Sequence, residues 1–431
     1  MTTTHDPLDI SVDISTQEII LAASNHNIPL LRRLFRDNQT PIANPANVKD
    51  TDTGFTPLHA AIAACEVDKD TDAAANGVQV NGTEHAAAEE KAQDEGVETV
   101  KFLLHEGAIW NDLDLAGETP GCLARRLGLM ELYDLMVDAG VRAELLLGRL
   151  DGYEALEDEE DEDEEEEGEK EGEVESEETA DVDAEIVDAP ELVTTTTTTI
   201  STDAPTTTTS NTDVTNPRYL DSTLTFQHDR LLDADQNGVM MAWESTIMKK
   251  SAQKLLPTPG LRVLNIGHGM GIVDTFLQEL SPSEHHIVEA HAEVVAEMKR
   301  KGWADKPGVV IHEGRWQDIL PGLVGEGVML DAIYYDTFAE SYADFRDFFS
   351  EHVIGLLEQE GRWSFFNGMG ADRQISYDVY QKVVEMDLFE AGFEVEWEEF
   401  EVPKLDGEWD GVRRPYWSIE KYRLPVCKYM D

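Results

Sequence analysis

The sequence is poor in cysteine and contains no long apolar run. Its three cysteines, Cys65, Cys122 and Cys427, are far apart in the chain, and none belongs to a C-x-x-C pair. This scatter argues against a disulfide framework and against a structural zinc site, and it favours a reducing compartment. No apolar stretch approaches the length that crosses a bilayer, and the first residues lack the basic and apolar regions of a signal peptide. We therefore expect a cytoplasmic and nuclear protein that does not contact membranes.

Basic residues are also scarce. The chain has 33 Lys and Arg against 89 Asp and Glu, which gives a formal net charge of -56. Residues 151–215 contain 26 acidic residues and one lysine, and the rest of the chain is acidic as well. Because acidic surfaces repel phosphate backbones, we do not expect nucleic acid as a direct ligand. A basic protein is the more favourable partner.

Composition divides the 431 residues into three segments. Residues 1–150 and 216–431 have a globular composition, whereas residues 151–215 consist largely of acidic residues and threonine runs. Such a segment cannot bury enough apolar surface to offset the entropy lost on ordering. We predict that residues 151–215 form a disordered, self-repelling linker between two domains. A binding site for basic tails is the alternative interpretation.

The first segment, residues 1–150, resembles a set of ankyrin repeats. Apolar residues between Thr16 and Asp37 recur at helical spacing. The stretch GFTPLHAAIAA, residues 54–64, matches the ankyrin signature, and a weaker copy, GETPGCLARRLG, occupies residues 117–128. We predict a small all-α, ankyrin-repeat-like domain, in which Thr56 and His59 hold a turn together by hydrogen bonds. The expected function of such a domain is protein binding.

The spacing of these two turns predicts an insertion. They lie 63 residues apart, whereas the ankyrin period is about 33 residues. The excess corresponds to a polar stretch near residues 66–95, which we predict to be disordered. The second helices of the two repeats are then expected at residues 97–108 and 129–141.

The third segment is organised around RVLNIGHGMGIVDTFLQE, residues 262–279. Its apolar start predicts a buried strand, glycines follow at positions 267, 269 and 271, and helical spacing begins at Ile272. Strand, glycine turn and helix form the first unit of a nucleotide-binding α/β sheet, where missing Cβ atoms let the backbone approach a ligand. The alternative is a turn that only connects the strand to the helix.

Two details of this segment indicate the cofactor. No Gly-Lys-Ser/Thr follows the turn, which excludes a P-loop, and the third glycine comes one residue too early for the dinucleotide fingerprint. Glu289 ends the next apolar run, 22 residues after Gly267, where a carboxylate accepts hydrogen bonds from ribose hydroxyls. This combination favours S-adenosylmethionine over ATP or NAD. A plain surface acid is the alternative interpretation of Glu289.

The remaining pattern predicts the fold class. Residues 237–250 are expected to be helical, and further strands are expected within residues 308–320, 330–338 and 361–368. Residues 393–402 and 415–426 are expected to close the sheet as an antiparallel pair. This alternation is typical of the α/β class, and specifically of the seven-stranded, Rossmann-like sheet of S-adenosylmethionine-dependent methyltransferases.

Five ordered motifs carry a family resemblance: MAWESTIM (241–248), VLNIGHGMG (263–271), HHIVEAH (285–291), GRWQDI (314–319) and YYDTF (334–338). Together they resemble guanidinoacetate methyltransferase and, more closely, its fungal relatives, the protein arginine δ-N-methyltransferases (type IV). The resemblance covers about residues 218–431 and, loosely, the ankyrin-like part. It implies a cofactor site made of Tyr219, Met248, His268, Gly269, Met270, Gly271, Ile272, Val273, Glu289, Ala290, His291, Trp316, Gln317 and Asp336. Gln317 departs from the small-molecule enzyme, which has Glu there, and Met240 is either a further pocket residue or a core residue.

Two acids are the candidates for catalysis. An arginine guanidinium is planar, keeps its proton above about pH 12, and presents its donors as a fork. Two carboxylates can clamp this fork and accept a proton as the new N–C bond forms. We predict these roles for Asp336, at the carboxyl end of its strand, and for Glu244, on the preceding helix; a solvated helix face is the alternative for Glu244. Trp243, Trp316 and Tyr335 would exclude water, and no residue grouping has metal-ligand spacing.

These observations predict an enzyme that methylates arginine on a protein. The resemblance implies the internal δ nitrogen as the target and a ribosomal large-subunit protein as the substrate, and we expect a monomer. Two other functions stay open at this point. One is a small-molecule guanidino methyltransferase, and the other is a non-enzymatic ankyrin scaffold with a degenerate methyltransferase domain.

Overall fold

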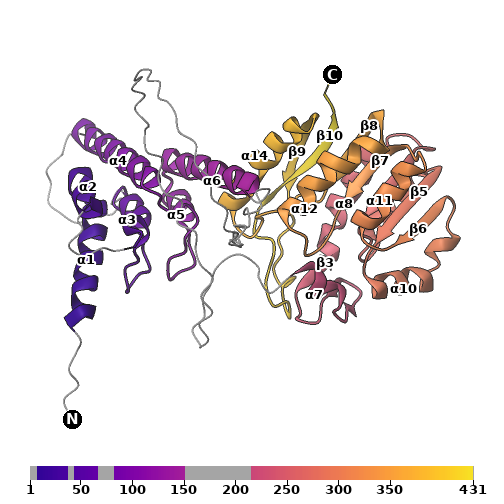
Figure 1. Cartoon of the computed structure of the whole chain (residues 1–431), viewed down its shortest axis with the longest axis horizontal. Helices are drawn as coiled ribbons and strands as arrows, with labels where there is room; N and C mark the ends of the chain where they lie inside the picture. Colours follow the sequence, from indigo (N-terminus) through magenta and orange to yellow (C-terminus); the bar gives the residue numbers. More distant parts are fainter. Residues whose placement is uncertain (1–6, 37–42, 67–81, 151–214, 431) are drawn as a thin grey trace, which may run out of the picture. The chain divides into compact units, whose positions relative to one another are not determined.

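The computed structural model describes residues 7–36, 43–66, 82–150 and 215–430 (Figure 1). The two predicted domains are not separate in it, because residues Met1–Gly152 and Val214–Asp431 belong to one compact unit. The predicted linker, residues 151–215, lies outside the described residues except for Thr215. Its disorder therefore stays a prediction.

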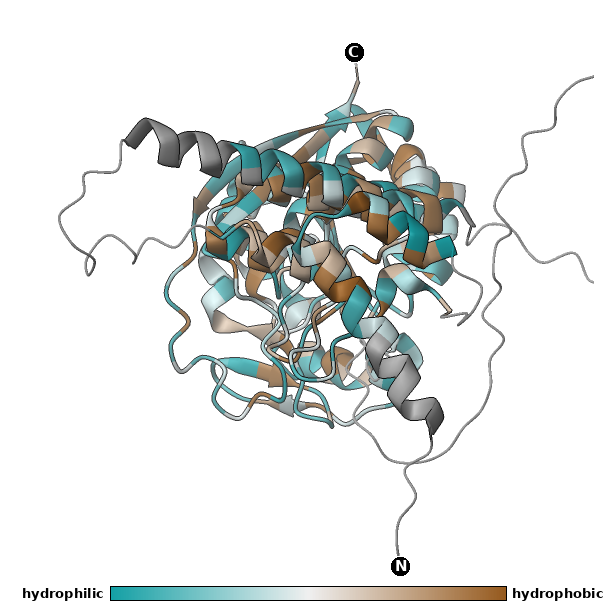
Figure 2. Cartoon of the chain, turned by 90° about the vertical axis from the view of Figure 1, so that its left-hand side faces the viewer, coloured by the Kyte–Doolittle hydropathy of each residue, from teal (hydrophilic) through white to brown (hydrophobic). Residues whose placement is uncertain are grey.

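The N-terminal part is helical. It contains α1 (Pro7–Ser24), α2 (Ile28–Arg36), the 3-10 turn η1 (Pro45–Asn47), α3 (Pro57–Ala63), α4 (Gly82–His105), α5 (Pro120–Leu127) and α6 (Met130–Leu150). Polar and apolar residues alternate around these helices in Figure 2, as expected for helices with one buried face. Among the described helices, none combines the length and the apolar character that crossing a bilayer requires.

Threonine caps begin α3 and α5. The backbone N–H of Thr56 donates to His59 Nδ1 at 3.2 Å, and Thr56 Oγ1 accepts from the backbone N–H of His59. The other ring nitrogen of His59, Nε2, lies 3.1 Å from the carbonyl oxygen of Glu118, which precedes the second cap, Thr119. The buried imidazole thus ties the turn before α3 to the turn before α5. This confirms the predicted structural role of Thr56 and His59.

Helix α4 corrects part of the predicted insertion. The helix begins at Gly82, so residues 82–95 are helical, while residues 67–81 lie outside the described residues. The stretch is rich in Ala and Glu, which are strong helix formers. Its polarity predicted a loop, but its intrinsic helix propensity predicts the helix that is found.

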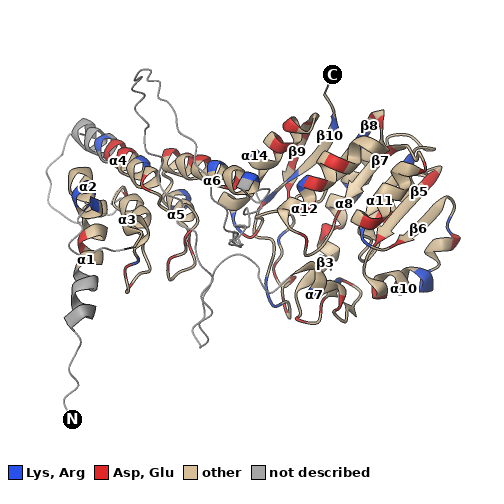
Figure 3. Ribbon diagram, viewed as in Figure 1, with Lys and Arg blue, Asp and Glu red and all other residues tan. Residues whose placement is uncertain are grey.

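Helices α5 and α6 pack against α14 (Gln374–Glu390), which belongs to the C-terminal part. Ile375, Val379 and Val383 of α14 share one apolar core with the N-terminal helices. Four side-chain hydrogen bonds between α6 and α14 border this core: Tyr133–Asp378, Lys382–Asp138, Tyr380–Glu144 and Arg149–Glu390. Figure 3 colours the charged residues of the two helices. The helical part therefore covers a face of the C-terminal part that would otherwise be apolar and exposed.

A small sheet precedes the main one and corrects a second prediction. The strands β1 (Thr225–Phe226), β2 (Arg230–Leu232) and β3 (Gly238–Met241) pair antiparallel. The 3-10 turn η3 (Ala242–Glu244) and helix α8 (Ser245–Leu255) follow. The helix expected over residues 237–250 is thus wrong for residues 238–241, because these residues find hydrogen-bond partners in β2. Glu244 lies on the short 3-10 turn rather than inside a helix.

The main sheet has seven strands in the spatial order β6 (Val309–Glu313), β5 (Glu284–Glu289), β4 (Arg262–Ile266), β7 (Leu330–Tyr335), β8 (Leu357–Phe365), β10 (Lys421–Tyr429) and β9 (Phe393–Glu401). The first five are parallel, and β10 is antiparallel to both of its neighbours. This confirms the predicted seven-stranded sheet of the α/β class. The last strand along the chain, β10, begins at Lys421 instead of near residue 415.

Helices cover both faces of this sheet (Figure 1). Val263 and Ile287 face a core with α8, α9 (Ile272–Glu279) and α10 (Ala292–Arg300). Their neighbours Leu264 and Val288 face the opposite core, which contains α11 (Trp316–Gly325), the π-helical turn η5 (Phe348–His352) and α13 (Val353–Leu356). Helix α12 (Tyr342–Asp347), the turn η4 (Trp303–Asp305) and the short α7 (Asn216–Leu220) complete the described elements. Parallel strands end together, so the carboxyl ends of β4, β5 and β7 form one edge for a ligand.

The close packing of α6 on α14 makes a stability prediction. A Cβ atom at Gly140 of α6 would lie 2.7 Å from Cγ2 of Val379 and 3.1 Å from the Trp110 ring. Because a buried valine is stiff at χ1, the Gly140→Ala variant should lose about 1–3 kcal/mol of unfolding free energy, despite the higher helix propensity of alanine. Chemical denaturation of the full chain measures this change.

The matched control is Gly322→Ala in α11. Gly322 is exposed, and a Cβ atom there meets no heavy atom within 4 Å. This variant should gain up to about 1 kcal/mol from helix propensity. A Gly140→Ala protein that is as stable as the wild type would contradict the tight α6–α14 contact.

Candidate active site

The glycine turn between β4 and α9 is built from three residues in the left-handed region. Gly267, Gly269 and Gly271 have φ angles of 91°, 53° and 79°. A Cβ atom at Gly267 would lie 1.9 Å from the carbonyl oxygen of Asp336, and one at Gly269 would lie 2.8 Å from Cε of Met240. The turn therefore requires glycine, both for its backbone conformation and for its close neighbours.

The carboxylate of Glu289 braces this turn. Its Oε2 accepts hydrogen bonds from the backbone N–H groups of His268 at 2.8 Å and Gly269 at 3.3 Å. Its Oε1 accepts from the backbone N–H of His291 at 2.7 Å. Glu289 is buried, so the alternative interpretation as a plain surface acid is wrong. The carboxylate holds the ends of β4 and β5 together while it faces the pocket.

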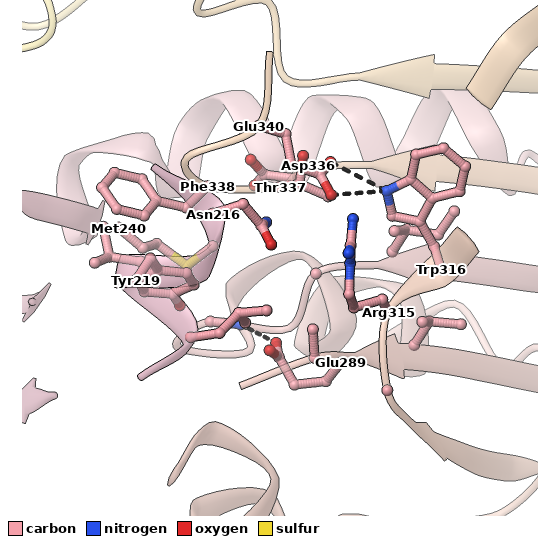
Figure 4. A pocket seen from close by; sticks show the side chains of 18 residues that line it. Asn216, Tyr219, Met240, Glu289, Arg315, Trp316, Asp336, Thr337, Phe338 and Glu340 are labelled. Atoms are coloured by element: carbon pink, nitrogen blue, oxygen red, sulfur yellow. Dashed lines mark hydrogen bonds between the residues drawn. The ribbon is translucent and has the colours of Figure 1, made fainter. Parts of the chain in front are cut away.

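A pocket opens beside the turn (Figure 4). Its walls come from α7, β3 and the segments that follow β4, β5, β6 and β7. The residues that line it are Asn216, Tyr219, Leu220, Val239, Met240, Ile266, Gly267, Gly269, Val288, Glu289, Ala290, Gly314, Arg315, Trp316, Asp336, Thr337, Phe338 and Glu340.

Helix α7 forms one wall of this pocket. The Nε2 atom of His291 lies 3.1 Å from the carbonyl oxygens of both Tyr219 and Ser222. The Tyr219 ring also packs edge-on against Phe338, with ring centroids 4.9 Å apart. His291 therefore anchors α7, and its ring lies behind the wall rather than in the pocket.

Glu340 fixes the opposite wall. Its carboxylate accepts from Nε1 of Trp316 at 2.9 and 3.1 Å and from the hydroxyl of Tyr335 at 2.5 Å. Gln317 donates to the same carboxylate at 3.4 Å. The residue before Glu340, Ala339, has a φ angle of 64°, which is uncommon for a residue with a side chain. The loop after β7 is thus held in an unusual backbone conformation by the contacts of Glu340.

The pocket brings together part of the predicted cofactor set. Tyr219, Gly269, Glu289, Ala290, Trp316 and Asp336 line it, and so does Met240. The residues that do not line it are Met248, His268, Met270, Gly271, Ile272, Val273, His291 and Gln317, together with Glu244 from the catalytic pair. Met248 and Val273 are core residues, and His268 turns inward to Asp274 at 2.6 Å. These residues support the pocket wall, and their contact with a cofactor stays a prediction.

Several pocket residues were missed from the sequence. They include Asn216, Arg315, Thr337, Phe338 and Glu340. Each of them is within four positions of a predicted residue, which is the one signal that the sequence offers. Figure 4 shows the Arg315 side chain extending into the pocket between Glu289 and Trp316. Only the bend of the chain after β6 decides that Arg315 faces the ligand side.

Asp336 follows the end of β7 and lies against the glycine turn. The side chain is half-buried, and its Oδ2 atom is buried without a hydrogen-bond partner among the described residues. Burial, and then the negative charge of Asp274, raise the pKa of Asp336 to about 7. A carboxyl group in this state changes its charge near neutral pH.

Glu244 is the second acid of the predicted catalytic pair. It is 3% exposed, so the alternative interpretation as a solvated helix face is wrong. Burial, and then the charge of Asp336, raise its pKa well above the ordinary value, while a hydrogen bond from the Tyr416 hydroxyl lowers it. Because the charge of Asp336 acts on Glu244, the two acids lie in one region. The ring of Trp243 packs beside them against Trp409 and Tyr416.

The residues of the pocket fit S-adenosylmethionine. The glycine turn leaves room where Cβ atoms would block a ligand, and Tyr219, Met240, Phe338 and Trp316 supply apolar and aromatic walls. Carboxylates and one guanidinium provide partners for hydroxyl groups and for a zwitterionic amino acid moiety. Within the described residues there is no group of three His, Cys, Asp or Glu side chains that could hold a metal ion.

Solved structures of methyltransferases have a similar fold. One is the O-methyltransferase TomG from Streptomyces achromogenes in complex with SAM, at 16% identity and a TM-score of 0.32, covering 44% of this chain and 82% of that chain. Another is M. jannaschii TYW2 in complex with AdoMet, at 11% identity and a TM-score of 0.31, covering 48% and 87%.

Comparisons of sequence cover a larger share of the chain, at higher identity, than these comparisons of structure. The family model described as Guanidinoacetate N-methyltransferase matches residues 211–422. The chain is 69% identical over 425 residues to Protein arginine N-methyltransferase 2 of Emericella nidulans, covering 98% of this chain and 99% of the relative. It is 42% identical over 443 residues to the protein of the same name from Gibberella zeae, covering 96% and 93%. With such similarity over nearly its whole length, this chain belongs to the protein arginine N-methyltransferase 2 family of S-adenosylmethionine-dependent methyltransferases.

Proposed function

We propose that this chain transfers a methyl group from S-adenosylmethionine to the guanidino group of an arginine in a protein. The observation that carries the proposal is the pair of acids beside the glycine turn: Glu244, which is buried, and Asp336, whose Oδ2 atom is buried. The Oδ2 atom of Asp336 has no partner among the described residues, and a buried carboxylate without partners is costly. A guanidinium supplies both the missing charge and the missing donors.

The cofactor roles follow from the walls of the pocket. We assign the ribose hydroxyls to Glu289, which can accept further hydrogen bonds because a carboxylate offers about four lone-pair sites. The adenine would lie toward Trp316, and the turn from His268 to Val273 would approach the cofactor through its backbone. When bound, the cofactor supplies a methyl group on a positively charged sulfur. Tyr219 and Phe338 would exclude water from it.

The reaction needs a proton acceptor, and it needs the attacking nitrogen, the methyl carbon and the sulfur to lie in one line. As the nitrogen lone pair forms a bond to the methyl carbon, the bond from that carbon to sulfur breaks, and the sulfur leaves as a neutral thioether. The guanidino nitrogen then loses its proton. We assign this proton to Asp336, because an acceptor with a pKa near neutral pH is well matched to the task. Glu244 would hold the other side of the guanidinium fork.

We propose the internal δ nitrogen as the target, as the resemblance to type IV enzymes implies, and a basic ribosomal large-subunit protein as the substrate. The acidic composition of the chain supports a basic partner. We also propose that the helical part, residues 1–150, is ankyrin-like and holds the substrate. Its two capped Thr-Pro turns, at Thr56 and Thr119, support this proposal.

Two other functions compete with this proposal. A small-molecule guanidino methyltransferase is suggested by the family model that matches residues 211–422. A non-enzymatic scaffold is disfavoured, because burying the Glu244 carboxyl and the Oδ2 atom of Asp336 is costly and a degenerate site would gain nothing from it. Similarity over nearly the full length to a relative named Protein arginine N-methyltransferase 2 favours methylation of arginine in a protein over methylation of a small molecule.

The functional test gives the full chain labelled S-adenosylmethionine with a basic ribosomal protein extract, with guanidinoacetate, or with free arginine. We expect label only in protein, and mass spectrometry of fragments should place the methyl group on the δ nitrogen of arginine. Label only in guanidinoacetate would establish the small-molecule function. Cofactor binding with no transfer to any of the three would establish the scaffold.

The two acids predict a separation of activity from stability. Asp336→Asn and Glu244→Gln keep the side-chain shape and remove the negative charge that pairs with a guanidinium. Each should lower kcat/KM by about 100-fold or more, since charged hydrogen bonds and proton transfer are both lost. Cofactor affinity, measured by calorimetry, should change much less.

The matched controls are Asp134→Asn and Glu131→Gln, which make the same changes at exposed positions of α6. They should leave activity unchanged. A Glu244→Gln enzyme with wild-type kinetics would remove Glu244 from the catalytic pair.

The pKa of Asp336 also predicts two pH effects. Activity needs the ionised carboxylate, so kcat/KM should rise with pH through about 7. Stability should run the opposite way: the pKa of Asp336 is raised on folding from 3.8 to about 7, so its contribution is fully present below the unfolded pKa, is lost as the pH rises between these two values, and is gone above about 7. Asp336→Asn should therefore raise the melting temperature of the cofactor-free protein more at pH 8 than at pH 5. Equal shifts at both pH values would contradict the raised pKa.

A further inference from the structure

The connection between β9 and β10, residues 402–420, reaches back to the catalytic acids. The hydroxyl of Tyr416 donates a hydrogen bond to Oε1 of Glu244. Glu244 is buried, and it lies on the 3-10 turn η3, far away in sequence. Tyr416 therefore joins a loop near the C-terminus to the acid that precedes the glycine strand.

The hairpin of β2 and β3 fixes the position of this loop. The backbone N–H of Arg413 donates to the carbonyl oxygen of Gln236 at 2.8 Å, and Nη1 of Arg230 donates to the carbonyl oxygen of Asp410 at 2.7 Å. A Cβ atom at Gly238 would lie 3.0 Å from Cε1 of Tyr416, so the glycine leaves the space that the ring occupies. The loop is thus seated on the hairpin by one backbone–backbone hydrogen bond, by one hydrogen bond from a side chain to the backbone, and by shape.

Aromatic rings enclose the Tyr416 hydroxyl. The centroid of the Tyr416 ring lies 4.9 Å from that of Trp409, on the same loop, and 6.1 Å from that of Trp243. Trp243 is the residue next to Glu244 in the chain. These rings keep water away from the Glu244 carboxylate, and the Tyr416 hydroxyl is the side-chain donor that orients it, beside a backbone hydrogen bond from Met241.

We infer that Tyr416 is a positioning residue: it fixes one oxygen of Glu244, leaves the other oxygen for the guanidinium, and so makes the β9–β10 loop part of the active site. This inference rests on the proposed function, because it assigns Glu244 to the arginine substrate. The loop would then complete the site only when it is seated on the hairpin.

The charge state of Glu244 reports on this contact. The titratable groups that interact with Glu244 are Asp336 after β7, Tyr334 of β7, Tyr422 of β10 and Tyr416. Burial and the charge of Asp336 raise the pKa of Glu244, and the hydrogen bond from Tyr416 lowers it. Loss of the Tyr416 hydroxyl should therefore leave Glu244 protonated up to a higher pH.

The test is Tyr416→Phe in the full chain, assayed for methylation of arginine in the ribosomal extract between pH 6 and 9. At pH 7 we expect kcat/KM to fall about tenfold or more, as for the loss of a hydrogen bond to a charged group. Part of this loss should be regained at high pH, so the acid limb of the pH profile should shift upward. Gly238→Ala, which crowds the same ring, should shift the limb in the same direction.

The matched control is Tyr380→Phe, which removes the hydroxyl that donates to Glu144 on α6. It should leave the pH profile in place. A Tyr416→Phe enzyme with wild-type kinetics, or one with the same fractional loss at every pH, would overturn the positioning role.

A second measurement separates this inference from the proposed function. The Glu244 carboxyl can be titrated by carbon-13 NMR, with its signal identified by its absence in the Glu244→Gln protein. If the wild type methylates nothing, the proposed function fails, while the titration still decides the contact. An equal titration midpoint in the wild type and in Tyr416→Phe would overturn the positioning role of Tyr416. A higher midpoint in the variant would support that role.

Discussion

The close approach of Gly267 to the backbone of Asp336 is the constraint on which the site depends. No side chain fits at Gly267, because its Cβ atom would lie 1.9 Å from the Asp336 carbonyl oxygen. Backbone hydrogen bonds extend the pairing of β4 with its neighbours β7 and β5 up to this point: Asp336 N donates to Ile266 O, and Gly267 N donates to Val288 O, both at 2.9 Å. The glycine turn and Asp336, to which we assign the catalytic role, are therefore placed by one strand edge. Methyl transfer depends on alignment of its reactants, so this shared edge serves the reaction directly.

Two aspartates near this edge, the buried Asp274 and the half-buried Asp336, differ in how the fold treats their charge. Burial raises the pKa of Asp274, but contacts with His268 and His285 outweigh burial and lower it to about 2. Hydrogen bonds of 2.6 and 2.9 Å join Asp274 to these rings. Asp336 has no such donors, and its pKa rises to about 7. The protein thus stabilises one anion with its own side chains and leaves the other ready for a cationic substrate.

The helical part is more than an attached binding module. Its core includes Ile375, Val379 and Val383 from α14, so removing residues 1–150 would expose an apolar face of the C-terminal part. Tyr133 of α6 donates to Asp378, which also accepts from Arg423 of β10 at 2.7 Å. A fragment that begins near residue 216 would lose these contacts. Studies of substrate recruitment by the helices are therefore best designed as surface substitutions in the full chain.

The sequence by itself determined the elements with strong local signals. The glycine turn, the parallel strands and the acid at the end of β5 could be predicted because backbone conformation and apolar periodicity are local properties. The tertiary structure alone decided which side chains face the ligand: it turned His268 inward, brought Arg315 and Glu340 into the pocket, and carried Tyr416 to Glu244. It also paired residues 238–241 as a strand where their pattern predicted a helix. These contacts join segments that are far apart in the chain, so a local sequence pattern cannot predict them.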